Sequence, residues 1–233
     1  MSKSFSSILR TASITAGAGL LALSAYASDA AAAKASKQQA LVNKATFAVQ
    51  SALLDSKIKE NTAHILHETK AVVICPDVTK MSLVFGGSGG RCVLLARGAN
   101  NSWSDPAFYH LSAGSFGIQA GYQHSQLFFF VTSQKALLNL MDHEFSFDAS
   151  ADAAFGNNSS STQNTPKEVY AMQKTKGVSA GVSLGSSKLK PDSEANRAYY
   201  HQVVGPEDIV VRMQVNNKAA DPLRRVVMKA FNQ

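Results

Sequence analysis

Apolar residues repeat with a helical period near both ends of the chain. Residues 30–70 are rich in Ala, Lys, Leu and Gln, contain no Gly or Pro, and place Leu41, Ala45 and Ala52 on one helical face. Between residues 221 and 231, apolar positions recur at i, i+3, i+4, i+7 and i+8, behind an Asp-Pro pair that suits a helix start. We therefore predict one or two amphipathic helices in the first segment and one at the carboxyl terminus.

The central segment has a different pattern, in which short apolar runs are punctuated by glycine. Residues 80–131 contain SLVFGG, RCVLLAR, FGIQAGY and QLFFFV, which are typical of antiparallel strands joined by tight turns, and we interpret FGGSGG at 85–90 as a hairpin turn. The same reasoning assigns the remaining elements, which are strands at 145–155 and 169–192 and short helices at 134–141 and 193–200. The predicted fold class is α+β, with a glycine-rich antiparallel β-sheet or partly closed barrel and N-terminal and C-terminal amphipathic helices.

The first 27 residues have the pattern of a secretory signal peptide. Lys3 and Arg10 give a basic start, residues 12–23 are apolar and small, and Ala25-Tyr26-Ala27 is a small-x-small cleavage pattern. An uncleaved membrane anchor is the alternative, but the apolar run is shorter than the roughly 20 residues that a spanning helix needs. The predicted organisation is a signal peptide at 1–27, a flexible N-terminal segment at 28–36, and a single domain at 37–233 with an exposed loop at 156–166.

The number and positions of the cysteines help to indicate the cellular compartment of the protein. Only Cys75 and Cys92 occur, and in an exported protein such a pair can form one disulfide; two buried thiols in apolar strands are the alternative. No cysteine lies near the cleavage site, so the thioether-lipid attachment of bacterial lipoproteins is not available. We expect an exported protein, located in the periplasm, peripheral to a membrane, or secreted.

The charge distribution favours contact with anionic surfaces. The formal net charge of +7 becomes +5 once cleavage removes the two basic residues of the signal. Two amphipathic segments, residues 34–70 with six lysines against three acidic residues and residues 210–233 with five basic residues against one acidic residue, are basic. They supply candidate lipid contacts, which are Lys44, Lys57, Lys59, Arg224, Arg225 and Lys229. The alternative is that both helices pack on the sheet and their cations are merely solvated. Nucleic acid is not an expected partner, because the basic residues are not interleaved with aromatic ones.

The string GVSLG at 181–185 matches the G-x-S-x-G nucleophile elbow of serine hydrolases, with Ser183 as the nucleophile. That elbow needs a helix directly after the serine, followed by an acid and a histidine farther along the chain. Here LGSSKLKPD follows, and the acids and His201 are compressed into a short stretch. We interpret the string as a Gly-rich antiparallel strand.

Other short motifs are also incomplete. FGGSGG lacks the lysine and hydroxyl of a phosphate-binding P-loop. His64 and His67 share a helical face with Glu68, but no H-E-x-x-H arrangement is present and the cysteines are not spaced as ligands. The sequence predicts no cofactor, no metal site and no catalytic residue.

Three ordered blocks are more specific than any of these strings. They are AVVICPDVTKMSLVFGGSGGRCVLL at 71–95, WSDPAFYHLSAGSFGIQAGYQHSQLFFFVTSQKALLNLM at 103–141, and KGVSAGVSLGSSKLKPDSEANRAYY at 176–200. Together they resemble the SYLF-domain family of lipid-binding domains, also described as actin-binding in yeast, over about residues 37–231. The signature residues of these blocks are Trp103, Pro106, Gly114, Gly117, Gly121, Gly177, Gly181, Pro191, Asp192, Asn196, Tyr199 and Tyr200.

The resemblance implies binding to anionic lipid surfaces, actin binding in eukaryotic members, and no catalytic activity. The chain departs from the family at Gln126, where an acidic residue is often found, and at Cys75 and Cys92. Because the chain carries an export signal, actin is not an expected partner.

Three functions follow as hypotheses. The first is an exported, non-enzymatic domain that binds anionic phospholipid or envelope surfaces. The second is a serine hydrolase that uses Ser183, and the third is a structural or small-ligand-binding envelope protein. The lipid or ligand, the protein partner and the oligomeric state are not specified by the sequence.

Overall fold

The computed structural model describes residues 18–54, 63–82, 85–116, 121–142, 144–147, 168–175, 178–181 and 187–232. The loop predicted at 156–166 lies outside these residues, as does the first part of the predicted signal peptide. Of the strand predicted at 145–155, only the beginning is described.

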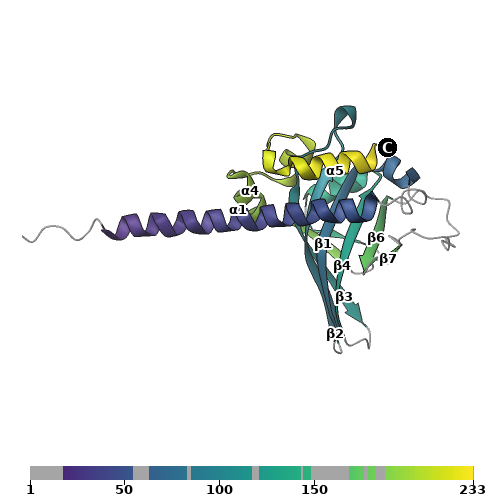
Figure 1. Ribbon diagram of the computed structural model, residues 1–233, viewed down its shortest axis with the longest axis horizontal. Helices are drawn as coiled ribbons and strands as arrows, with labels where there is room; N and C mark the ends of the chain where they lie inside the picture. The colour runs from purple at the N-terminus through teal and green to yellow at the C-terminus, as the bar shows by residue number, and fades with distance from the viewer. Residues whose placement is uncertain are drawn as a thin grey trace, which may run out of the picture.

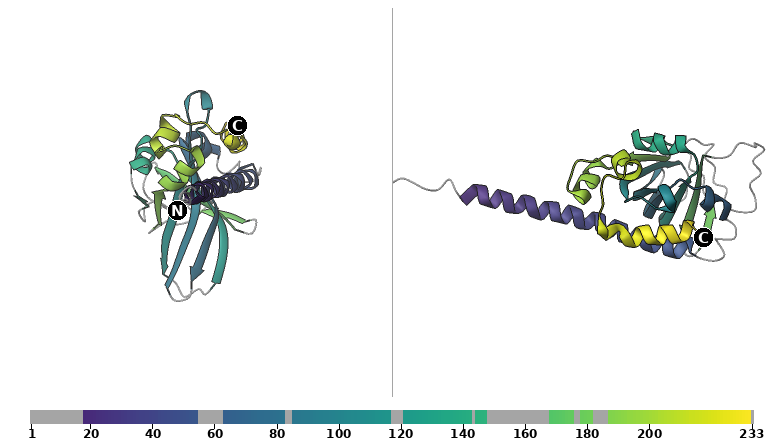
Figure 2. Two further views of the ribbon diagram at one scale, coloured as in Figure 1. Left: turned by 90° about the vertical axis from the view of Figure 1, so that its left-hand side faces the viewer. Right: turned by 90° about the horizontal axis from the view of Figure 1, so that it is seen from above.

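One antiparallel sheet forms the centre of the domain (Figure 1). Its strands are β1 (Ala71–Ser82), β2 (Phe85–Ala96), β3 (Ala107–Phe116), β4 (Gly121–Val131), β5 (Phe145–Ser146), β6 (Val169–Thr175), β7 (Val178–Gly181) and β8 (Ser187–Pro191). Their order is β5-β8-β3-β2-β1-β4-β6-β7, and all the neighbouring pairs are antiparallel. Figure 2 shows that the sheet is curled rather than flat, so the predicted α+β fold with a partly closed sheet is confirmed.

The central part of the described sheet is buried on both faces, which explains the uninterrupted apolar runs of its strands. Alternate residues of a strand point to opposite faces. On β1, Val72 and Ile74 belong to the core beneath the long helices, whereas Val73 and Cys75 belong to the core on the other face. Two apolar layers therefore hold the central strands.

Helices divide between the two faces. The helices α1 (Ala18–Leu53), α4 (Ser193–Tyr200) and α5 (Asp221–Phe231) contribute buried residues to one core, and α3 (Gln134–Asp142) contributes to the other. A further short helix occupies residues 63–68. Three irregular turns, η1 (Ala99–Asn101), η2 (Glu207–Val211) and η3 (Lys218–Ala220), complete the described elements. The helices predicted at 134–141, 193–200 and 221–231 match α3, α4 and α5.

The helix α1 is longer than its packed part. It runs through residues 28–36, which the sequence predicts as a flexible N-terminal segment and which are helical in the structure. Its first described buried residue is Gln38, and the part before it projects beyond the sheet (Figure 1). None of the described helices combines the length and apolar character needed to cross a membrane.

The glycine-rich run FGGSGG lies within strand β2 and does not form the predicted hairpin turn. Gly87 pairs with Met81 on β1 and with Gly114 on β3, so this part of the run sits between two neighbouring strands. Gly90 lies opposite Val78, just past a bulge where the register of β1 shifts between Ile74 and Asp77. The predicted turn rests on the frequency of glycine in turns, but glycine in a strand also permits a close backbone approach.

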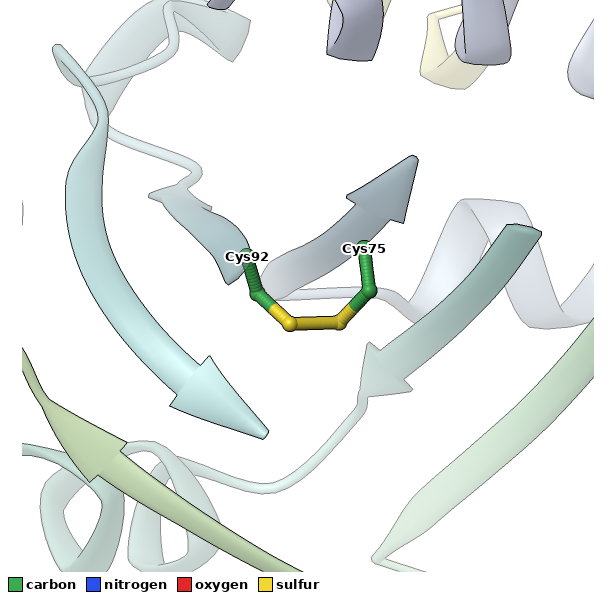
Figure 3. The surroundings of a disulfide bond; sticks show 2 residues. All are labelled: Cys75 and Cys92. Carbon is green, nitrogen blue, oxygen red and sulfur yellow. A yellow bond between two sulfur atoms is a disulfide. The ribbon is translucent and has the colours of Figure 1, made fainter. Parts of the chain in front are cut away.

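The two cysteines form a disulfide across β1 and β2 (Figure 3). Cys75 and Cys92 lie within the bulge, between the pairs Ile74–Val93 and Asp77–Arg91, with their Cα atoms 4.1 Å apart. Neither residue is exposed to solvent. Of the two alternatives that the sequence leaves open, the structure has the disulfide.

Candidate functional site

The outer face of α1 presents a phenylalanine and a lysine to solvent. Val42, Ala45 and Val49 lie on the inner face and are buried against the sheet. Phe47 lies on the opposite side of the helix and is 69% exposed, one turn beyond the exposed Lys44. An apolar ring held out in water beside a cation is the arrangement that interfacial helices use.

The outer face of α5 has a similar composition. Arg225, Met228 and Lys229 are exposed there, while the opposite side of the helix is buried. The two helices lie side by side in the same layer (Figure 2). We call the outward faces of α1 and α5, with Lys44, Phe47, Arg225, Met228 and Lys229, the helix-layer surface.

The helix-layer surface is positively charged. Among the described residues, Arg225 and Lys229 have no ion-pair partner. The Lys44 ammonium lies 3.2 Å from the carboxylate of Asp77, which also contacts the His124 ring at 2.8 Å. Burial alone would raise the pKa of Asp77, but the hydrogen bonds with His124 and Lys44 outweigh it and leave that pKa below its ordinary value. Asp77 therefore stays ionised near neutral pH and holds Lys44 against the sheet.

The other predicted lipid contacts have different positions. Lys57 and Lys59 lie outside the described residues. Arg224 is half-buried and has a structural role, because its Nε donates a hydrogen bond to the carbonyl oxygen of Trp103 at 2.9 Å. Its Nη1 lies 3.2 Å from Asp221. Lipid contact by Arg224 stays a prediction, and the structure shows that this residue anchors α5.

Sequence reasoning missed Phe47 and Met228. On a helical projection, Phe47 falls about 160° to 200° away from Ala45 and its buried neighbours, since each residue advances the helix by about 100°. The same projection places Met228 between the basic Arg225 and Lys229. The sequence signal that could have identified both residues is an apolar residue on the polar face of an amphipathic helix.

The signature P-D-S-E-A-N-R-A-Y-Y fastens α4 to its neighbours. Asp192 is the N-cap of α4 and accepts a hydrogen bond from the backbone N–H of Ala195 at 2.9 Å. The fully buried Asn196 accepts one from the backbone N–H of Phe108 at 2.8 Å. Pro191 is the last residue of β8. These residues fix the position of α4 against β3.

The two tyrosines that close the signature anchor the helix at its other end. The Tyr199 hydroxyl donates to the side-chain oxygen of Gln39 on α1 at 2.9 Å, and the Tyr200 hydroxyl donates to the carbonyl oxygen of Pro106 at 2.7 Å. Burial raises the pKa of both phenols above the ordinary value of 10.0, so both remain neutral donors at physiological pH.

The remaining signature residues lie in the core, in strands, or outside the described residues. Trp103 is buried against Phe231 of α5, with ring centroids 4.8 Å apart, and the Arg97 guanidinium lies 5.4 Å from its ring centroid. Gly114, Gly121 and Gly181 lie in strands β3, β4 and β7. Gly117 and Gly177 lie outside the described residues.

The described residues assemble no catalytic constellation around the GVSLG string. Ser183 itself lies outside them. The described chain resumes at Ser187 as strand β8 rather than as the helix that a nucleophile elbow requires. The Asp192 carboxylate caps α4, and its Oδ2 lies 2.7 Å from Nε2 of His110. The part of the chain that the structure describes contains no group of three metal-ligating side chains.

Comparison with known proteins places the chain in a family. A family model described as Las17-binding protein actin regulator (Ysc84) matches residues 112–230. Protein YSC84 from Saccharomyces cerevisiae is 28% identical over 182 residues, which are 72% of this chain and 38% of that protein. SH3 domain-containing YSC84-like protein 1 from Bos taurus is 24% identical over 161 residues, which are 64% of this chain and 45% of that protein.

The chain spans less than half the length of these curated relatives. The matched region runs from β3 to α5 and includes the P-D-S-E-A-N-R-A-Y-Y signature, so the resemblance to SYLF domains is confirmed. The chain belongs to the Ysc84 family, described as Las17-binding protein actin regulators.

Proposed function

We propose that this protein is an exported, non-enzymatic domain that associates with anionic lipid or envelope surfaces through the helix-layer surface. The observation that carries the proposal is the exposure of Phe47 and Met228 beside Arg225 and Lys229, two cations without an ion-pair partner among the described residues; Lys44 lies next to Phe47 and is paired with Asp77. Cations near an anionic membrane contribute on the order of 1 kcal/mol each, and burying a phenylalanine side chain contributes about 1.5–3 kcal/mol. Together they support reversible, salt-sensitive binding.

Export is part of the proposal and has two supports. The first is the signal-like sequence of residues 1–27, whose removal would leave every described buried residue of α1 in place, since these begin at Gln38. The second is the Cys75–Cys92 disulfide, because disulfides persist mainly in oxidising compartments. Protease protection of the protein in intact cells, lost when the outer barrier is opened, is the expected result for a periplasmic location.

Sedimentation with vesicles tests the proposal. We expect the folded protein to co-sediment with phosphatidylglycerol-containing vesicles at low salt and to dissociate from them at high salt. It should not bind pure phosphatidylcholine vesicles. Failure of the protein to bind either kind of vesicle, at low and at high salt alike, would contradict the proposal.

Matched variants test the surface itself. Phe47→Ser and Arg225→Gln should each weaken vesicle binding, whereas Leu138→Ser and Lys135→Gln should not. Leu138 and Lys135 are likewise exposed, but they lie on α3, which covers the opposite face of the sheet. If the two pairs of variants lose binding equally, the helix-layer surface is not the contact.

The family description names Las17 and actin. Because we propose that this chain is exported, neither is an expected partner. Co-sedimentation with filamentous actin is expected to leave the protein in the supernatant, and saturable pelleting would overturn that expectation.

A further inference from the structure

A groove lies between α1 and strands β1 and β2, on the face that the helices partly cover. Its volume is about 360 Å³, which is enough for a small molecule or a headgroup. The residues that carry the argument are Lys37 and Lys44 on α1, Asp77 and Thr79 on β1, and Gly89 and Arg91 on β2.

The floor of the groove is bare backbone because residue 89 is glycine. A Cβ at Gly89 would have one neighbour within 4 Å, the carbonyl oxygen of Leu111 at 3.4 Å, so packing does not exclude a side chain there. Gly90 is different, because its Cβ would meet the carbonyl oxygen of Asp77 at 2.9 Å. Gly89 therefore leaves open a space that almost any other residue would fill.

The groove has an excess of positive charge. Lys37, Lys44 and Arg91 face one carboxylate, Asp77, which is already engaged by Lys44 at 3.2 Å. Arg91 has only a long contact with Asp192, at 4.0 Å. Lys37 has no ion-pair partner among the described residues. Lys37 thus has no acidic partner among the described residues and Arg91 has only a long one, so both can offer charge to a ligand.

We propose that this groove binds a phosphomonoester group. A guanidinium and two ammonium groups around a bare backbone floor match a compact dianion, and a phosphomonoester carries close to two charges at neutral pH. A carboxylate or a phosphodiester brings only one charge. The Thr79 side chain lies at the same wall and supplies a hydroxyl donor.

The phosphomonoester has two sources, a soluble sugar or glycerol phosphate and a lipid headgroup of the phosphatidic acid type. The soluble source is independent of the proposed function, whereas the lipid source rests on it. Lys44 belongs to both the groove and the helix-layer surface, so a lipid headgroup in the groove would lie at the edge of the membrane-facing layer.

Calorimetric titration of the folded protein with glycerol 3-phosphate at low salt tests the site. We expect saturable binding that Arg91→Gln and Lys37→Gln each weaken about 10-fold, while Arg225→Gln on the helix-layer surface leaves it unchanged. Gly89→Val should abolish binding with no change in charge. Absence of saturable binding, or an equal loss in Arg225→Gln, would overturn the proposal. Because Arg91 and Lys37 are solvent-accessible, these two variants are expected to fold even if Gly89→Val does not.

Vesicles containing phosphatidic acid or phosphatidylglycerol at equal surface charge separate the two sources. If the lipid is a source, the protein prefers phosphatidic acid and Arg91→Gln removes that preference. If the source is soluble only, glycerol 3-phosphate binds and the two vesicles are equivalent. Glycerol 3-phosphate binding without any vesicle binding contradicts only the proposed function. Vesicle binding without preference and without glycerol 3-phosphate binding contradicts only the groove.

Discussion

The side-chain oxygen of Asn196 accepts a hydrogen bond from the backbone N–H of Phe108 at 2.8 Å, and this bond ties α4 to the start of β3. Asp192 adds a second tie, since its backbone N–H donates to the carbonyl oxygen of Phe108 at 2.9 Å. Both backbone groups of Phe108 are therefore used by the signature segment. A helix end and a strand end are joined by one short motif, which explains why its spacing is specific.

Replacing Asn196 by alanine should destabilise the domain by about 1–3 kcal/mol, because the buried N–H of Phe108 would lose its acceptor. Urea unfolding followed by circular dichroism measures the change. Arg197→Ala, one residue along but exposed, should stay within about 0.5 kcal/mol of the wild type. Equal urea midpoints for the two variants would show that the Asn196–Phe108 hydrogen bond does not stabilise the domain.

Removing the disulfide with Cys75→Ala and Cys92→Ala together should reduce the free energy of unfolding by about 3 kcal/mol. The physical reason is that the bridge joins residues 17 positions apart and restricts the unfolded chain. Reductant should lower the unfolding midpoint of the wild type and leave that of the double variant unchanged. Because both cysteines are fully buried, we expect reduction only when the domain opens, so sensitivity to reductant in the absence of denaturant would contradict the burial.

The elements that the sequence predicts well are those with local signals. The C-terminal helix begins at Asp221, has Pro222 in its first turn and repeats its apolar residues at helical spacing, so its bounds follow from local sequence. Asp221 is not its cap, because Ala220 occupies the N-cap position and makes no side-chain hydrogen bond. The helix after Asp192, by contrast, has an N-cap in the sequence. Antiparallel pairing of the glycine-punctuated strands was likewise predictable.

The features that the sequence does not predict depend on tertiary contacts. Gly90 looks like a turn residue, yet it lies in a strand because the bulge of β1 brings a carbonyl oxygen close to it. Arg224 looks like a surface cation, yet it reaches the backbone of Trp103, 121 residues away in the chain. Lys37 and Arg91 are far apart in sequence and share a groove only because α1 packs across β2. Such pairings leave no local pattern.

Asp105 should give the domain a measurable dependence on pH. This carboxyl is buried, and burial raises its pKa despite a hydrogen bond from the backbone N–H of Asn217 and the nearby Arg224, while Asp221 raises it further. A raised pKa means that the folded state binds the proton more tightly. The contribution of Asp105 to the free energy of unfolding is therefore greatest below the ordinary pKa of 3.8 and is lost as the pH rises through the raised pKa.

Asp105→Asn should remove that fall, because asparagine keeps an acceptor for Asn217 and does not titrate. Urea unfolding of both proteins between about pH 3.5 and pH 8 gives the difference in free energy, which should change by about 1.4 kcal/mol for each unit by which the pKa is raised. Taking the difference cancels the opposite dependence of Asp77, whose lowered pKa removes stability on acidification. Parallel curves would contradict the burial of Asp105.

Gly90→Ala should destabilise the domain by about 1–3 kcal/mol, because the added methyl group would lie 2.9 Å from the carbonyl oxygen of Asp77 and 3.0 Å from a methyl group of Val78. Backbone cannot move aside as cheaply as a flexible side chain, so the bulge between β1 and β2 must shift. Gly87→Ala is the matched control in the same strand, since its methyl group would meet only the carbonyl oxygen of Ala113, at an ordinary 3.7 Å. Urea midpoints of the two variants measure the contrast, and an equal loss in both would mean that strand propensity rather than the bulge sets the requirement for glycine at position 90.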